Sequence, residues 1–271
     1  MLRLLAVTTL VGMTTTLGVL PILVTREVSR RAYDIMLGLG AGLMLAAATL
    51  GLLPESLAAV RVDGVLVWTR LAITLGGFGC GVALLSLLDR LIPHSHAGGH
   101  REHVHGHEDA HAHCEHSNAH DKARHQGMLI VGAMTLHRLP EGFAIGAGFA
   151  DSATVPLGVM LAVAVGLQNA IEGAVMAAPL KRGGLGRGRL VALVAASGLS
   201  VPVAAVVGSY LARMVTGALP FMLAVGAGAL LYLTCNEIIP ESHSHGNEKR
   251  ATFGLLLGVV VIILVRVLVG G

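Results

Sequence analysis

The sequence of 271 residues is poor in charged side chains, aromatic side chains and cysteine. Asp, Glu, Lys and Arg make up 13% of it, and Phe, Trp and Tyr only 3%. Hydrophobic residues make up 54%, and the mean hydropathy is +0.74. This balance excludes an ordinary soluble globular domain. The three cysteines, Cys80, Cys114 and Cys235, show no CxxC spacing, so no disulfide framework is expected.

Long apolar runs dominate the chain instead. A bilayer core takes about 20 apolar residues per helix, and runs of this length exclude a β-barrel. We expect an all-α polytopic membrane protein whose first run is a retained signal anchor, not a cleaved signal peptide. The domains expected are helices 1–3 in 1–92, a loop at 93–126, helices 4–5 in 127–180 and helices 6–8 in 181–271. The eight expected spans are about 4–24, 36–60, 66–92, 127–150, 154–180, 188–212, 217–242 and 251–269.

The distribution of Lys and Arg predicts the orientation of these spans. The connections after spans 1, 3, 5 and 7 hold thirteen basic residues, and the opposite side holds five. The positive-inside rule therefore places both termini outside and the 93–126 loop in the cytoplasm. Membrane topology accounts for the pI of about 9.0, so no nucleic-acid partner is expected.

An internal repeat relates the second span to the seventh. GAG at 40–42 and PES at 54–56 recur at 226–228 and 240–242, so both motifs are displaced by the same offset along the sequence. Because these two spans cross in opposite directions, the match indicates an inverted repeat of spans 1–3 and 6–8, with spans 4 and 5 between them. Secondary transporters are often built this way. Coincidence in a sequence rich in Gly and Ala is the alternative.

Two pairs of polar residues occupy the fourth and fifth spans. His137 and Glu141 are four residues apart, as are Gln168 and Glu172, so each pair shares a helix face. An imidazole, two carboxylates and an amide oxygen suit Zn²⁺, and also Cd²⁺, Fe²⁺, Co²⁺ or Mn²⁺. Ionisable residues inside a membrane are costly and usually functional. The alternative is that these side chains only join helices by hydrogen bonds.

The motifs HRLPEG and QNAIEG resemble the paired metal-binding motifs of the ZIP (Zrt/Irt-like) family of divalent metal transporters, in particular its bacterial GufA-like branch. The likeness extends to LLPES, NEIIPES, SGLSVP and a His-rich loop between spans 3 and 4. It implies a 3+2+3 inverted-repeat bundle in a bacterial inner membrane. It also implies a first metal site formed by His137, Glu141, Gln168 and Glu172.

The chain departs from the family pattern at a second metal site beside the first. The resemblance implies that this site shares both glutamates and adds three oxygen ligands, of which only Asn169 is present here. Arg138 stands in place of an Asn, and Val201 in place of a Glu. A guanidinium would repel a cation and pair with a glutamate. We therefore predict a single-metal site in which Arg138 substitutes for the second ion and either gates the passage or only balances charge.

Two further segments carry metal ligands. The stretch 94–125 holds eleven of the fourteen histidines and reads as a flexible metal-binding tract or, alternatively, a solvated linker. Its candidate ligands are His103, His105, His107, His111, His113 and His116, with Cys114 as a soft ligand. The end of the seventh span offers a candidate exit path or an ordinary polar helix end. Its residues are Asn236, Glu237, Glu241, His243 and His245.

These observations predict a transporter, not an enzyme, that imports a divalent transition metal, foremost Zn²⁺, into the cytoplasm. The metal is substrate, and no organic cofactor is expected. A non-transporting metal sensor or buffer shares every ligand with the transporter and stays open. An intramembrane metalloenzyme would want a further strong His, and no other span contains one well inside the membrane. Beyond the metal and the lipid bilayer, the glycine-rich faces suggest a homodimer.

Overall fold

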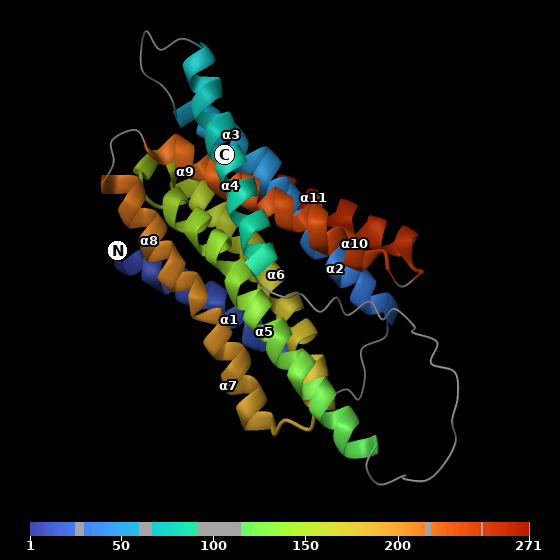
Figure 1. Cartoon of the computed structure of the whole chain (residues 1–271). Coiled ribbons are helices and arrows are strands. Elements are labelled where there is room, and N and C mark those ends of the chain that lie inside the picture. The colour runs from blue at the N-terminus through green and yellow to red at the C-terminus, as the bar shows by residue number, and fades with distance from the viewer. Residues whose placement is uncertain (25–29, 60–66, 92–114, 215–217, 245, 271) are drawn as a thin grey trace.

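The computed structural model describes residues 1–24, 30–59, 67–91, 115–214, 218–244 and 246–270. This part of the chain is a bundle of long helices without a strand (Figure 1), which confirms the predicted all-α membrane fold. The helices are α1 (Leu2–Val24), α2 (Arg30–Ala46), α3 (Leu53–Ala59), α4 (Val67–Leu91), α5 (Glu115–Gly148), α6 (Val155–Arg182), α7 (Arg187–Gly198), α8 (Ser200–Met214), α9 (Ala218–Leu233), α10 (Ile239–Ser242) and α11 (Glu248–Gly270). Short π-helical turns, η1 (Ala47–Leu52) and η3 (Thr234–Ile238), interrupt the second and seventh spans, and the 3-10 turn η2 (Ser152–Thr154) precedes α6.

Seven continuous stretches among the described residues are long and apolar enough to cross a membrane. The eighth expected span lies in α5, which is not one of the seven because His137, Arg138 and Glu141 lower its hydropathy. All three residues are buried in the bundle. An ionisable side chain can occupy a membrane-spanning helix when it faces protein and not lipid. The polar residues therefore mark α5 as an interior helix.

The fourth helix begins earlier than expected. We expected its start near residue 127, whereas α5 begins at Glu115, so the last part of the expected 93–126 loop is helical. The segment 115–126, EHSNAHDKARHQ, contains no Gly or Pro, and its Glu, Ala, Lys, Arg and Gln favour helix. Hydropathy alone could not detect this extension because it is hydrophilic. It projects at one end of the bundle (Figure 1).

Close glycine contacts repeat across the two halves of the molecule. Helix α4 packs along α9, and α11 packs along α2. At four positions on α4 and α11 a Cβ on glycine would collide with a backbone carbonyl of the facing helix: Gly77 with Phe221, Gly81 with Val225, Gly254 with Ile35, and Gly258 with Leu39. Gly254 follows Gly77 by the same number of residues as Gly258 follows Gly81. The contacted residues are also evenly related, because Phe221 follows Ile35 by the same number as Val225 follows Leu39. The offset of the partners equals that of the GAG and PES motifs. These regularities support the predicted inverted repeat, while the complete 3+2+3 arrangement stays a prediction.

The π-helical turns fall at matching places in this repeat. The offset that relates the two copies of PES also brings η1 onto 233–238, and η3 covers 234–238. Each turn lies just before one copy of PES. A π-turn inserts a residue into a helix and is often found at functional sites. In both halves of the repeat, the helix therefore changes register just before the PES motif.

Two apolar clusters enclose the middle of α5 and α6. One contains Leu157–Val165 residues of α6 and Ala144–Ala147 residues of α5, and the other contains Val131 of α5 and Ala174–Leu180 residues of α6. The polar residues at 137–141 and 168–172 lie between these clusters along both helices. The fold thus seals a polar layer between two apolar layers.

Candidate functional site

Helices α5 and α6 contribute three pairs of polar residues that are related by one constant offset along the sequence: His137 with Gln168, Arg138 with Asn169, and Glu141 with Glu172. All six are buried, with exposed fractions from 0% for Arg138, Glu141 and Asn169 to 5% for Glu172. A glycine follows each glutamate, and a Cβ at Gly142 would collide with the Val201 carbonyl, while one at Gly173 would collide with that of Thr15. The two helices are thereby held tightly against α8 and α1.

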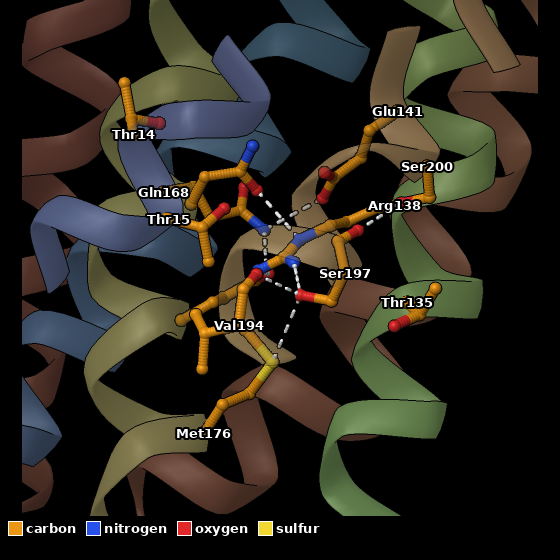
Figure 2. Close-up of polar contacts among 12 residues, drawn as sticks. Thr14, Thr15, Thr135, Arg138, Glu141, Gln168, Met176, Val194, Ser197 and Ser200 are labelled. Carbon is orange, nitrogen blue, oxygen red and sulfur yellow. Dashed lines mark hydrogen bonds and ion pairs between the residues drawn. The ribbon is translucent and has the colours of Figure 1, made fainter. Parts of the chain in front are cut away.

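Gln168 joins the two carboxylates. Its Nε2 donates to Glu141 Oε1 at 3.0 Å and to Glu172 Oε1 at 2.7 Å. Figure 2 shows Gln168 and Glu141 pointing toward one another across the α5–α6 interface. Within the described residues, Glu141 Oε2 and Gln168 Oε1 accept no hydrogen bond although both atoms are buried. Two acceptor atoms without a donor are therefore left beside the bridged carboxylates.

Arg138 uses all three guanidinium nitrogens. Nη2 pairs with Glu172 Oε2 at 3.2 Å, Nε donates to Asn169 Oδ1 at 3.2 Å, and Nη1 donates to Ser197 Oγ at 2.6 Å. Figure 2 shows the side chain reaching from α5 toward Ser197 of α7. Asn169 in turn donates through Nδ2 to the Val11 carbonyl of α1 at 3.1 Å. One guanidinium thus links α5, α6 and α7, and its partner Asn169 adds α1.

The imidazole of His137 lies toward the seventh span. Its Nε2 is 3.5 Å from Glu237 Oε1 in the π-helical turn η3. Glu237 was expected in an exit path. Here its carboxylate lies beside His137, a predicted ligand of the metal site. The predicted metal site and the polar end of the seventh span are therefore adjacent at this contact.

The predicted ligands are neighbours, but their donor atoms do not converge. No three His, Cys, Asp or Glu side chains in the described part of the chain are arranged to hold a metal ion. The physical reason lies in the contacts above: Arg138 and Gln168 engage Glu172, and His137 lies beside Glu237. The side-chain amide of Gln168 points its nitrogen at the carboxylates of Glu141 and Glu172, whereas a metal ion would be bound by the amide oxygen. Rotating the Gln168 amide by half a turn would bring Oε1 into that position.

The remaining candidates are dispersed. Asn236 is exposed, Glu241 lies in α10, and His243 is engaged by Ser242 Oγ, the Ile239 carbonyl and Thr252 Oγ1 at 2.8, 2.9 and 3.2 Å. Beyond the described residues lie His245 and the loop candidates His103, His105, His107, His111 and His113 with Cys114. The side chain of His116 also lies outside the described part.

Comparison with known proteins matches a family model described as "ZIP Zinc transporter" to residues 1–266. The chain belongs to the ZIP zinc transporter family. It is 35% identical to "Zinc transporter GufA" of Myxococcus xanthus over 264 residues, which is 96% of each chain. It is also 35% identical to "Zinc transporter ZIPB" of Bordetella bronchiseptica, covering 94% of this chain and 78% of that one. With "Zinc transporter ZupT" of Corynebacterium aurimucosum the identity is 28%, over 93% and 91% of the two chains.

Two parts of this ZIP site were missed by reasoning from sequence. Ser197 accepts the shortest hydrogen bond that Arg138 donates, and the Val11 carbonyl accepts a hydrogen bond from Asn169. Ser197 opens the SGLSVP motif, so its position in a motif was a usable signal. A backbone carbonyl carries no sequence signal at all. Val201, in the place of the expected Glu, is fully buried and forms part of the apolar cluster around Leu161.

Proposed function

We propose that this ZIP protein imports a divalent transition metal, foremost Zn²⁺, into the cytoplasm through the layer formed by α5 and α6. The observation that carries the proposal is the buried Glu141–Gln168–Glu172 bridge, with His137 one turn from Glu141. Carboxylate oxygens and an imidazole nitrogen are Zn²⁺ ligands. The printed names of the relatives above, all zinc transporters, support zinc as the cargo.

Arg138 takes the place of a second metal ion. It neutralises Glu172 and donates to Asn169, the one retained member of the three ligands that the second site adds to the shared glutamates. A fixed positive charge leaves room for one divalent ion next to it, since two would repel each other and the guanidinium. Glu141 Oε2, Gln168 Oε1 after amide rotation, and Glu172 Oε1 then serve the single ion, and His137 joins when it turns from Glu237.

The exit runs along the seventh span to the His-rich loop. Glu237 Oε1 is 3.5 Å from His137 Nε2. Glu241 and His243 follow Glu237 toward the end of the seventh span. An ion leaving the midplane would thus meet a carboxylate at once. Import by this path requires both termini outside, as the distribution of basic residues predicts. Transport then proceeds by rocking of α1 and α5–α8 against the other helices, with the site near the bilayer midplane.

Flux into liposomes tests this proposal. The purified protein is reconstituted, external Zn²⁺ is raised, and luminal zinc fluorescence is followed. We expect uptake by the parent and a loss of at least tenfold for His137→Ala and Glu172→Gln, since each removes a ligand. Glu248→Gln, an exposed carboxylate at the start of α11, is the matched control and should keep parental flux.

Other outcomes decide between function classes. A parent that binds zinc at the midplane but shows no flux under any gradient contradicts transport and supports the sensor or buffer. Hydrolytic activity that disappears with the same two variants would support the metalloenzyme. Equal flux in Glu172→Gln and the parent would contradict the assigned site.

A further inference from the structure

Four arginines gather at the end of the bundle where α5 enters, α6 ends and α7 begins. They are Arg124 of α5, Arg182 at the end of α6, and Arg187 and Arg189 in the first turn of α7. All four are exposed. We call them the basic corner. Only a four-residue turn, 183–186, separates Arg182 from Arg187.

This turn has a fixed geometry. Leu185 N–H donates to the Leu180 carbonyl at 3.1 Å and Gly184 N–H to that of Lys181 at 3.0 Å, while Gly184 has φ +74°. These bonds form a Schellman motif, which terminates a helix in one defined conformation. Leu185 also packs into the apolar cluster that contains Leu180. The arginines on either side of the turn are therefore held at a set spacing.

The same turn joins the basic corner to the neighbouring helices. A Cβ at Gly183 would lie 2.7 Å from Arg124 Cα, so α5 and the turn are in backbone contact. Lys181 Nζ donates to the Ile22 carbonyl near the end of α1. The corner thus lies on three helices, α5, α6 and α7, and Lys181 connects it to α1. Helices α5 and α6 also carry the candidate metal site.

Three of the four arginines in the basic corner have no counter-charge among the described residues. Arg124, Arg187 and Arg189 form no ion pair with any described residue. The sequence contains no Asp or Glu between Gly173 and Asn236. Positive side chains in the first turn of a helix are also disfavoured by the helix dipole, so α7 itself does not stabilise Arg187 or Arg189. An external anion would provide a counter-charge for Arg124, Arg187 and Arg189.

We infer that the basic corner binds the phosphate headgroup of an anionic phospholipid. The corner lies where apolar spans end, which is the level of the headgroups, and guanidinium forks match phosphate oxygens. Basic pockets between the ends of transmembrane helices are suited to anionic lipids. A bound lipid would tie the end of α7 to those of α5 and α6. The inference is independent of which ion the protein carries.

Lipid titration monitored by native mass spectrometry tests the inference on the full-length protein. Phosphatidylglycerol is compared with phosphatidylcholine of the same acyl chains. For Arg187→Gln combined with Arg189→Gln we expect phosphatidylglycerol to bind about 25-fold more weakly, from about fivefold for each arginine at an anionic surface. Arg3→Gln removes an exposed arginine at the start of α1 and should leave binding unchanged. Binding of phosphatidylcholine should be the same in these variants as in the parent.

Three results would overturn the inference: equal phosphatidylglycerol affinity in the double variant and the parent, an equal loss in Arg3→Gln, or full displacement of the lipid by millimolar inorganic phosphate. The last result would identify a free anion as the ligand. Arg187→Lys with Arg189→Lys keeps the charge and should retain most of the binding. Circular dichroism of every variant should match the parent, and a single Arg189→Gln replaces the double variant if that one fails to fold.

Discussion

A single buried guanidinium determines the chemistry of the polar layer. Arg138 is fully enclosed, yet each of its nitrogens has a partner, from Glu172, Asn169 and Ser197. A lysine could not reproduce this, because an ammonium lacks the planar fork that reaches three partners in different directions. At this position the side chain is both a counter-ion for Glu172 and a tie between helices.

Removing the arginine while keeping its partner should be costly. We expect Arg138→Met to lower the free energy of unfolding by about 3–5 kcal/mol, because it leaves the Glu172 carboxylate buried without a counter-ion. Denaturation in detergent, followed by circular dichroism, measures this loss. Arg3→Met is the exposed control and should change little. Combining Arg138→Met with Glu172→Gln should recover part of the stability; a larger loss in the double variant would contradict the assigned pairing.

Restoring the missing oxygen ligands should change the metal stoichiometry. In the parent with residues 94–125 deleted, we expect one Zn²⁺ per chain at the midplane. Arg138→Asn combined with Val201→Glu supplies two oxygen ligands and removes the guanidinium, so we expect two ions. Calorimetric titration counts them. Two ions already bound in the parent at the midplane would contradict the role given to Arg138.

At the scale of elements, glycines decide how closely the helices approach. Gly81 lies against the Val225 carbonyl, and its repeat counterpart Gly258 lies against that of Leu39. Contacts of this kind leave no room for a side chain and bring backbones together in a way typical of membrane helices. Gly79 is on the same helix as Gly81 but faces open space.

These contacts predict matched effects in the two halves. Gly81→Ala and Gly258→Ala should each lower the free energy of unfolding by about 1–3 kcal/mol, because the added methyl group collides with backbone. Gly79→Ala should be neutral or slightly stabilising, since alanine favours helix by about 1 kcal/mol. Thermal unfolding in detergent compares the three. If only one of Gly81→Ala and Gly258→Ala lowered the free energy of unfolding, the two halves would not be packed equivalently.

At the scale of the whole molecule, the direction of transport depends on topology. The expected spans put thirteen basic residues on the side of the 93–126 loop and five on the other. Each charge carried across the membrane is costly during insertion, so this bias predicts the orientation. The basic corner lies on the same side as the loop.

Cysteine labelling checks the orientation. With Cys80 and Cys235 replaced by serine, Cys114 in the expected cytoplasmic loop is the only thiol left. We expect a membrane-impermeant maleimide to leave it unmodified in intact cells and to label it after permeabilisation. Labelling in intact cells would place the loop outside and reverse the proposed direction of import.

Much of this fold and part of its site can be predicted from local patterns. Spans appear as apolar runs, and His137 with Glu141 and Gln168 with Glu172 appear as pairs on one helix face. The early start of α5 was not predictable from hydropathy, since that segment is polar. The contact of His137 with Glu237 was hidden as well, because it depends on the π-helical turn η3.

The sequence by itself determined the membrane class, the repeat of PES at 54–56 and 240–242, and the identity of the polar residues on α5 and α6. These follow from composition and spacing along one chain. Only the tertiary structure decided which partners Arg138 takes, that Gln168 bridges the two carboxylates, and that the four arginines form one corner. The reason is that each depends on contacts between helices far apart in sequence, and helix packing fixes those contacts.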